Sequence, residues 1–167
     1  MRGDTMTGPA AGVIAEATLD DVPRLSELLS VLFAQESDFE PCDEKQREGL
    51  RQIIASPDVG RILVWRDDTG PRAMVNLLFT ISTAKGGRVA LLEDMVVHPS
   101  LRGHSVGEKL LAAAIQFCRE QRCARITLLT DRENESARRF YARQGFQVSA
   151  MAPMRLQLDA TEHHGKA

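Results

Sequence analysis

The stretch Leu91-Leu-Glu-Asp-Met-Val-Val-His-Pro-Ser-Leu-Arg-Gly-His-Ser-Val-Gly107 decides the fold. Its first half predicts a strand that ends at Pro99, and its second half is a glycine-containing loop that opens a helix over residues 105–121. Another strand is expected at residues 125–130. Because a helix that connects two neighbouring strands of one sheet makes them parallel, this segment predicts a parallel strand pair with the helix packed over it.

The residues before this segment predict an antiparallel sheet. Three strand-like runs at residues 61–65, 72–82 and 88–97 are separated by the turn signals Asp67-Asp-Thr-Gly70 and Lys85-Gly-Gly87, which is typical of a meander. An edge strand is expected earlier, at residues 13–17.

Capping signals predict the remaining helices. Thr18 and Asp21 form a capping pattern before one helix, and Asp43 is expected to cap a second. Asn134 is expected to cap a last helix, which Gly145 ends at its C′ position. Strands at residues 146–148 and 154–158 are expected to close the sheet. The fold class is therefore α/β (α+β), with a central, mixed, mostly antiparallel sheet flanked by helices.

Composition indicates one ordinary globular domain. The chain has 167 residues, of which 43% are hydrophobic and 26% charged, which fits one domain at residues 11–158 with flexible tails at 1–10 and 159–167. The formal net charge of −2 argues against nucleic-acid binding, and no apolar run approaches the roughly 18 residues of a membrane span. We expect no signal peptide, because the first residues lack a long apolar run. The 3 cysteines show no disulfide or metal-ligand spacing, so we also expect no bound metal and a cytoplasmic protein.

The loop that opens the long helix has the features of an anion site. Backbone N–H groups at a helix start lack intrahelical partners and lie at the positive end of the helix dipole. Gly103 and Gly107 allow close approach to the backbone, and Arg102 adds side-chain donors. A structural alternative exists, because Ser105 and Glu108 also match a capping box. The residues alone indicate a phosphate-bearing ligand, and they match neither a Walker loop nor a dinucleotide fingerprint.

Two motifs in order resemble the GCN5-related N-acetyltransferase (GNAT) superfamily. Arg102-Gly-His-Ser-Val-Gly107 resembles its [Q/R]xxGx[G/A] acetyl-CoA motif, and Asn134-x-x-Ala137-x-x-Phe140-Tyr141-x-x-x-Gly145-Phe146 resembles its C-terminal motif. The match covers about residues 60–158, and the helices before it match in layout. Ser105 departs from the glycine that the family prefers at this position.

The resemblance implies acetyl-CoA as co-substrate and assigns residues to hold it. The pyrophosphate would meet the backbone of the loop, and the pantetheine would pair with the end of the preceding strand, where an N–H group would polarise the thioester carbonyl. Asn134 would contact the pantetheine arm or a water near the tyrosine. Arg138, Arg139 and Arg143 share one helix and could meet the 3′-phosphate, although for most of them the alternative is a solvated basic face. The complete set of expected cofactor residues is Met95, Val96, Val97, Arg102, Gly103, His104, Ser105, Val106, Gly107, Asn134 and Arg138.

Three residues are candidates for proton transfer. The resemblance assigns Tyr141 as the general acid for the departing thiolate; the alternative is an aromatic anchor beside Phe140. Glu93 and Asp94 are adjacent carboxylates in an apolar strand, so at least one should be buried, which would raise its pKa and suit a base for an ammonium group. We expect Glu93 to be the base and Asp94 to support it. The alternative is a structural pair, one member bridged to Arg72 or Arg88.

The sequence predicts an N-acetyltransferase that acts on a primary amine, with a small molecule as the acceptor. The acidic loop at residues 34–43 would favour a cationic amine, although a solvated loop is the alternative. Two other functions remain open: acetylation of a protein lysine or N-terminus, and a non-enzymatic acyl-CoA sensor of the same fold. A homodimer is common in the superfamily.

Overall fold

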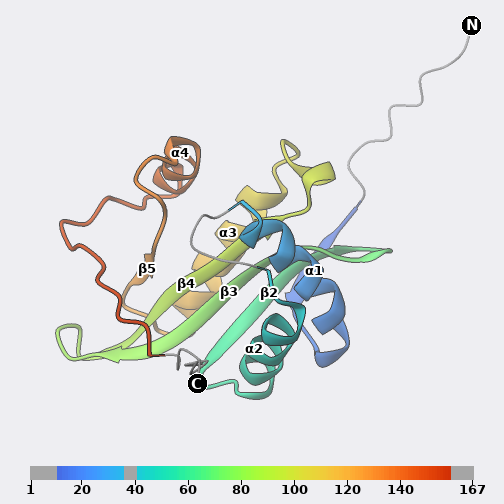
Figure 1. Cartoon of the computed structure of the whole chain (residues 1–167). Helices are drawn as coiled ribbons and strands as arrows, with labels where there is room; N and C mark the ends of the chain where they lie inside the picture. The colour runs from blue at the N-terminus through green and yellow to red at the C-terminus, as the bar shows by residue number, and fades with distance from the viewer. Residues whose placement is uncertain (1–10, 36–40, 159–167) are drawn as a thin grey trace, which may run out of the picture.

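The computed structural model describes residues 11–35 and 41–158 (Figure 1). One sheet with strand order β1-β2-β3-β4-β5 forms the centre of the domain. The first three strand pairs are antiparallel and β4 pairs with β5 in parallel, which confirms the predicted meander and crossover. The strands are β1 (Val13–Glu16), β2 (Gly60–Asp67), β3 (Gly70–Ser82), β4 (Gly87–Val97) and β5 (Ile126–Leu128).

Helices cover both faces of the sheet (Figure 1). α1 and α2 pack on one face, α3 packs on the other, and α4 lies beyond the end of β5. The helices are η1 (Leu19–Asp21), α1 (Val22–Phe33), α2 (Asp43–Ala55), η2 (Pro99–Leu101), α3 (Val106–Glu120) and α4 (Glu135–Arg143). None of the helices within the described residues has both the length and the apolar character needed to cross a membrane.

The two apolar cores explain the strand sequences. Ile62 and Val64 face α1 and α2, whereas Leu63 and Trp65 face α3, and all four are at most 5% exposed. Side chains alternate between the faces of a strand, so a strand that is covered on both sides must be apolar throughout. This is why residues 62–65 form an unbroken apolar run.

Polar contacts fix the ends of the first helices. Asp21 accepts from the Thr18 backbone N–H at 2.9 Å, which confirms the first capping pattern, and it also pairs with Arg66 of β2. Asp43 does not cap α2 but is its first residue, where its carboxylate accepts from Ser26 of α1 at 2.7 Å. This hydrogen bond connects the start of α2 to α1.

The prediction of two closing strands at residues 146–148 and 154–158 is wrong. The described chain has no strand after β5. Most apolar side chains of this segment stay in solvent, with Met154 98% and Leu156 81% exposed, whereas Phe146 is half-buried. Alternating apolar residues predict a strand, but a strand also needs a partner edge. β5 itself is shorter than expected and ends at Leu128.

The Ser105–Glu108 capping box, which the sequence offered as an alternative, does not form, although α3 begins where it was expected. Ser105 has a φ of 60° and its side chain makes no capping hydrogen bond. The left-handed conformation brings Cβ close to the carbonyl oxygen and costs roughly 1–2 kcal/mol in a residue other than glycine. The loop therefore imposes on Ser105 a backbone conformation that its sequence does not favour.

We expect Ser105→Gly to stabilise the protein by about 0.5–1 kcal/mol, because the relief of the left-handed strain exceeds the entropy that glycine loses on folding. For a chain of this size, the melting temperature should rise by roughly 1–4 °C in a thermal unfolding scan.

Ala112→Gly is the matched control, since Ala112 is an exposed residue in the interior of α3. Glycine in a helix is unfavourable, so this variant should melt lower than the wild type. A lower melting temperature for Ser105→Gly as well would contradict the strain at Ser105.

Candidate active site

A bulge in β4 opens the sheet. Asn76 of β3 lies opposite Asp94, but the next residue, Leu77, lies opposite Leu92, so Glu93 is an extra residue on β4. Pairing between β4 and β5 ends at Leu92. A bulge bends its strand and increases the local twist, and here it stands where β4 and β5 separate.

The bulge also changes which backbone groups face the gap. Before it, Ala90 donates its N–H toward β5, to the Arg125 carbonyl at 2.9 Å. After it, His98 donates its N–H in the opposite direction, to Arg72 of β3 at 2.8 Å. In an antiparallel pair the direction alternates from residue to residue. The odd-numbered residues Met95 and Val97 therefore point their backbone groups into the gap beside β5.

The start of α3 offers a second set of backbone donors. Gly103, with a φ of 80°, turns the chain toward the helix, and the first intrahelical bond runs from the Lys109 N–H to the Ser105 carbonyl at 3.0 Å. Several N–H groups before Lys109 have no partner in the part of the chain that the structure describes: those of Gly103, Ser105, Val106, Gly107 and Glu108. Together with the helix dipole they can bind an anion.

A cavity of about 550 Å³ joins these two sets of donors. It contains most of the expected cofactor residues: Met95, Val96, Val97, Arg102, Gly103, Ser105, Val106, Gly107 and Asn134, with Tyr141. His104 instead lines a separate cavity of about 320 Å³ with Trp65 and Lys109. Arg138 also lies outside the first cavity, where its guanidinium donates to the Arg132 carbonyl at 3.1 Å.

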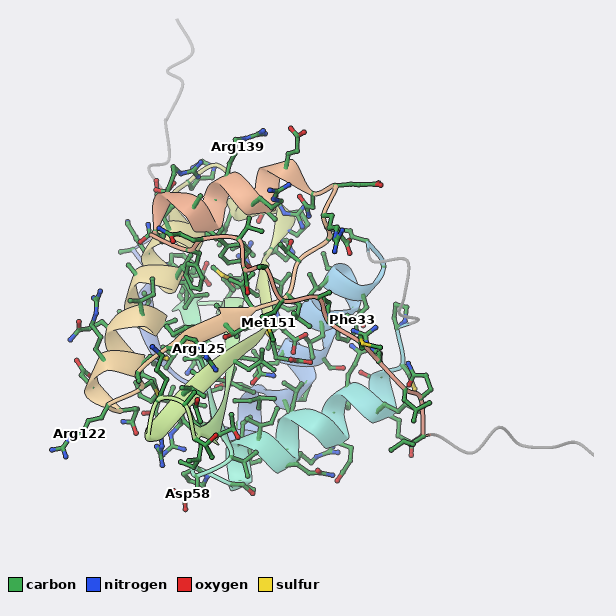
Figure 2. The ribbon with its side chains drawn as sticks, turned by 90° about the vertical axis from the view of Figure 1, so that its left-hand side faces the viewer. Phe33, Asp58, Arg122, Arg125, Arg139 and Met151 are labelled. Atoms are coloured by element: carbon green, nitrogen blue, oxygen red, sulfur yellow. The ribbon has the colours of Figure 1, made fainter. Side chains whose placement is uncertain are left out.

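The cavity also includes residues that the sequence analysis did not select or left as alternatives. Leu32 and Gln35 come from the end of α1, and Arg139 and Arg143 come from α4. Figure 2 shows Arg139 extending outward from α4. Arg143 pairs with Glu108 of α3 at 3.3 Å. A periodic apolar pattern predicts that Leu32 belongs to a helix face, but it does not indicate that this face borders a cavity.

Tyr141 lies where α4 meets the cavity. The Asn134 side chain caps the helix by accepting from the Ala137 N–H at 3.0 Å, as predicted. The Tyr141 ring packs edge-on against Phe140 and Phe146, with centroids 5.1 and 5.7 Å away. Burial raises the pKa of Tyr141 to about 12. The phenol is therefore protonated near neutral pH and can donate its hydrogen.

The end of α4 confirms the role of Gly145. This residue has a φ of 94°, and the N–H groups of Gly145 and Phe146 donate to the carbonyls of Ala142 and Tyr141. The pattern is a Schellman motif, which requires a left-handed residue at C′. It ends the helix two residues after Tyr141 and turns Phe146 back against the tyrosine ring.

The two carboxylates of β4 lie in different environments. Glu93, at the bulge, is exposed, whereas Asp94 is half-buried and accepts from the Asn76 amide at 3.1 Å. Burial raises the pKa of Asp94 and the Glu93 charge adds to the rise, while the Asn76 hydrogen bond opposes it. Neither carboxylate lines the cavity, but Val96 does, and it lies two residues after Asp94 on the same face of the strand.

The salt-bridge alternative for these carboxylates is not found. Arg72 pairs with Asp67 at 3.3 Å, and Arg88 lies over the Phe79 ring and donates to Gln121. The described residues contain no group of three or more side chains suited to a metal. Cys118 is buried, which raises its pKa to about 12 and makes it a poor nucleophile.

Comparison with known proteins agrees with this arrangement. Over 136 residues, the chain is 26% identical to the aminoalkylphosphonate N-acetyltransferase of Salmonella typhimurium, covering 81% of this chain and 85% of the relative.

Two solved structures share the fold. One is an integron cassette protein from the Cole Harbour salt marsh metagenome, with a TM-score of 0.76, 24% identity and coverage of 88% of this chain and 91% of that one. The other is glucosamine-6-phosphate N-acetyltransferase from Arabidopsis thaliana, with a TM-score of 0.69, 21% identity and coverage of 87% and 98%. The family model for the Acetyltransferase (GNAT) family matches residues 24–146, and the chain belongs to this family of acetyltransferases.

Proposed function

We propose that this protein transfers an acetyl group from acetyl-CoA directly to a primary amine of a small molecule. The observation that carries the proposal is the cavity in which the β4 edge that no longer pairs with β5, the N-terminus of α3 and Tyr141 meet. The small-molecule acceptor is supported by the likeness to aminoalkylphosphonate N-acetyltransferase.

The residues present fit acetyl-CoA. The unpartnered N–H groups of Gly103 and of residues 105–108 suit a pyrophosphate, and Arg102 and Arg139 at the cavity add positive charge. The backbone of Met95 and Val97 faces the gap beside β5 and would pair with the amide groups of the pantetheine arm, as an added strand does. When bound there, acetyl-CoA supplies an activated thioester.

Tyr141 serves as the proton donor in this proposal. Tyr141 belongs to the cavity lining, and no other tyrosine exists in the chain. A thiol has a pKa near 8.5, so a phenol with a pKa of about 12 transfers its proton to a thiolate uphill. Tyr141 therefore contributes by donating a hydrogen bond to the developing charge and by delivering the proton late.

Asp94 replaces Glu93 as the proposed base. A base for an ammonium group needs a pKa closer to neutrality than an exposed carboxylate has, and burial raises the pKa of Asp94 in that direction. Asp94 also lies on the sheet face where α1 contributes Leu32 and Gln35 to the cavity. The acceptor amine would enter from this side, with Glu93 adding negative charge nearby and proton transfer running directly or through a water.

The first prediction concerns the reaction. In an assay of thiol release from acetyl-CoA, we expect turnover with one class in a panel of aminoalkylphosphonates, polyamines, aminoglycosides, amino sugars, amino acids and lysine peptides. Tyr141→Phe should lower kcat by roughly 10²-fold, which is typical of losing a general acid, and should keep the thermal shift that CoA produces.

Reactions without amine and without enzyme correct for hydrolysis. If no amine in the panel gives turnover but CoA still raises the melting temperature, the result favours a sensor or an untested protein acceptor. If CoA does not raise the melting temperature, the cofactor assignment is contradicted. Phe146→Leu is the matched aromatic control, because it removes a ring packed on Tyr141 while keeping the hydroxyl.

The second prediction separates the two carboxylates. Because the pKa of Asp94 is raised, its carboxyl gains a proton as the pH falls through that pKa, and kcat/KM should decline on the acid side. Asp94→Asn should lower kcat/KM by roughly 10²-fold and remove this decline, whereas Glu93→Gln should change the rate by less than about threefold.

Complete pH profiles of both variants provide the measurement. If Glu93→Gln removes the acid-side decline and Asp94→Asn preserves it, the base is Glu93, as the sequence suggested.

A further inference from the structure

Asn76 is a polar residue in an apolar core. It lies in the interior of β3 and is 3% exposed, and its neighbours Ile62 on β2 and Met74 on β3 are at most 2% exposed. Asn76 faces the α1–α2 side of the sheet, since Met74, two residues before it, belongs to that core. A leucine would satisfy the strand pattern at this position, so the amide requires another explanation.

Only half of the amide is used. Nδ2 of Asn76 donates to Oδ2 of Asp94 at 3.1 Å, directly across the β3–β4 pair. Oδ1 of Asn76 is buried and has no hydrogen-bond partner among the described residues. A buried carbonyl oxygen without a partner is unfavourable. The side chain that contacts Asp94 therefore carries an unused acceptor next to a titratable carboxyl group.

We propose that Asn76 is the positioning residue for Asp94, serving the carboxylate through its Nδ2 donor and the protonated acid through its Oδ1 acceptor. The inference rests on the proposed function, in which Asp94 accepts a proton from the acceptor amine. A primary amide can exchange its two ends by rotating about the last side-chain bond, and the two ends are nearly equal in size. The exchange therefore needs no repacking of the surrounding core.

The proton balance is simple. An N–H bond of the acceptor ammonium breaks and an O–H bond forms on Asp94, which changes R–NH3+ and a carboxylate into R–NH2 and a carboxylic acid. The new O–H group forms on the carboxyl oxygen that faces the amine. A half-turn of the carboxyl group about its last side-chain bond brings this O–H to Asn76, whose Oδ1 accepts from it after the amide has rotated. Asn76 thus keeps the carboxyl group on the β3 side in both states and leaves its other oxygen for the amine.

Among the described residues, Glu93 is the charged group that acts on the pKa of Asp94. Glu93 of β4 is an acceptor and repels the carboxylate. Arg24 of α1 pairs with Glu27, and Arg72 of β3 pairs with Asp67. Asp94 therefore has an uncharged hydrogen-bond partner, whose contact opposes the effect of burial on the pKa.

The test compares Asn76→Leu with the wild type in two measurements. The first is a carboxyl 13C NMR titration of Asp94 in the free protein, assigned with Asp94→Asn, and the second is the pH profile of kcat/KM. Asn76→Leu removes both contacts, and because the hydrogen bond to the charged carboxylate is stronger than the one to the neutral acid, the pKa of Asp94 should rise by about one unit. The acid-side decline should move up by the same amount, so the rate below it falls about tenfold while the rate at the high-pH plateau is kept within a few-fold.

Two further variants separate positioning from structure. Met74→Leu changes packing one pair along the same face and should move neither titration. Asn76→Asp keeps the shape of the side chain, so it provides a folded variant if the leucine does not fold, and its negative charge should raise the pKa of Asp94 further.

Each result has one meaning. An Asp94 titration that stays the same in both Asn76 variants overturns the proposal. If the titration moves and the kinetic decline does not, the contact is real but Asp94 is not the base, and the failure belongs to the proposed function. A wild type that is silent in every amine assay also overturns the catalytic role, while the NMR titration still reports on the contact.

Discussion

The separation of β4 from β5 is the constraint on which the rest of the structure depends. A continuous parallel pair would occupy the backbone groups of both strands and leave only side chains to bind a ligand. Glu93 interrupts that pairing by adding one residue to β4. After it, Met95 and Val97 present backbone groups to open space, while Asp94 and Val96 turn their side chains toward α1. The single inserted residue therefore sets both the backbone groups that face the gap beside β5 and the side chains that face α1.

The cores on the two faces hold this opening in place. Leu110, Leu111 and Ala114 of α3 are fully buried against one face, and Leu25 and Leu28 of α1 are buried against the other. Closing the gap would require β4 to straighten between these two layers, and packed interiors resist such shifts. The same packing holds Ser105 in its strained backbone conformation, because α3 must start where its N–H groups reach the gap.

Local signals allowed most of the fold to be predicted. The strand, loop and helix of residues 91–107, the turns of the meander and the Gly145 cap all follow from residues close together in sequence, and all are confirmed. A prediction that depended on a distant partner was wrong, because residues 154–158 alternate like a strand but have no strand edge to pair with. The predicted Ser105–Glu108 capping box was also wrong. Both residue types match the motif, but the left-handed backbone of Ser105 does not allow the capping hydrogen bond. The site shows the same division. The cavity-lining loop was expected from its motif, whereas Asn76 stands as a single polar residue in a strand, and only the structure shows that it is buried against Asp94.

The construction of α4 has a consequence for how a ligand is held. No residue of this helix is fully buried. Its link to α3 is an exposed ion pair, Arg143 with Glu108, and a close approach of Phe140, whose ring would lie 3.5 Å from a methyl group placed on Gly107. Helices with so little buried surface open at low free energy, ahead of the global unfolding of the domain. A ligand that fills the space between β4 and α4 adds contacts to the helix and slows the hydrogen exchange of its amides. The observed affinity is then lower than the intrinsic affinity, because part of the binding free energy is used to order Tyr141.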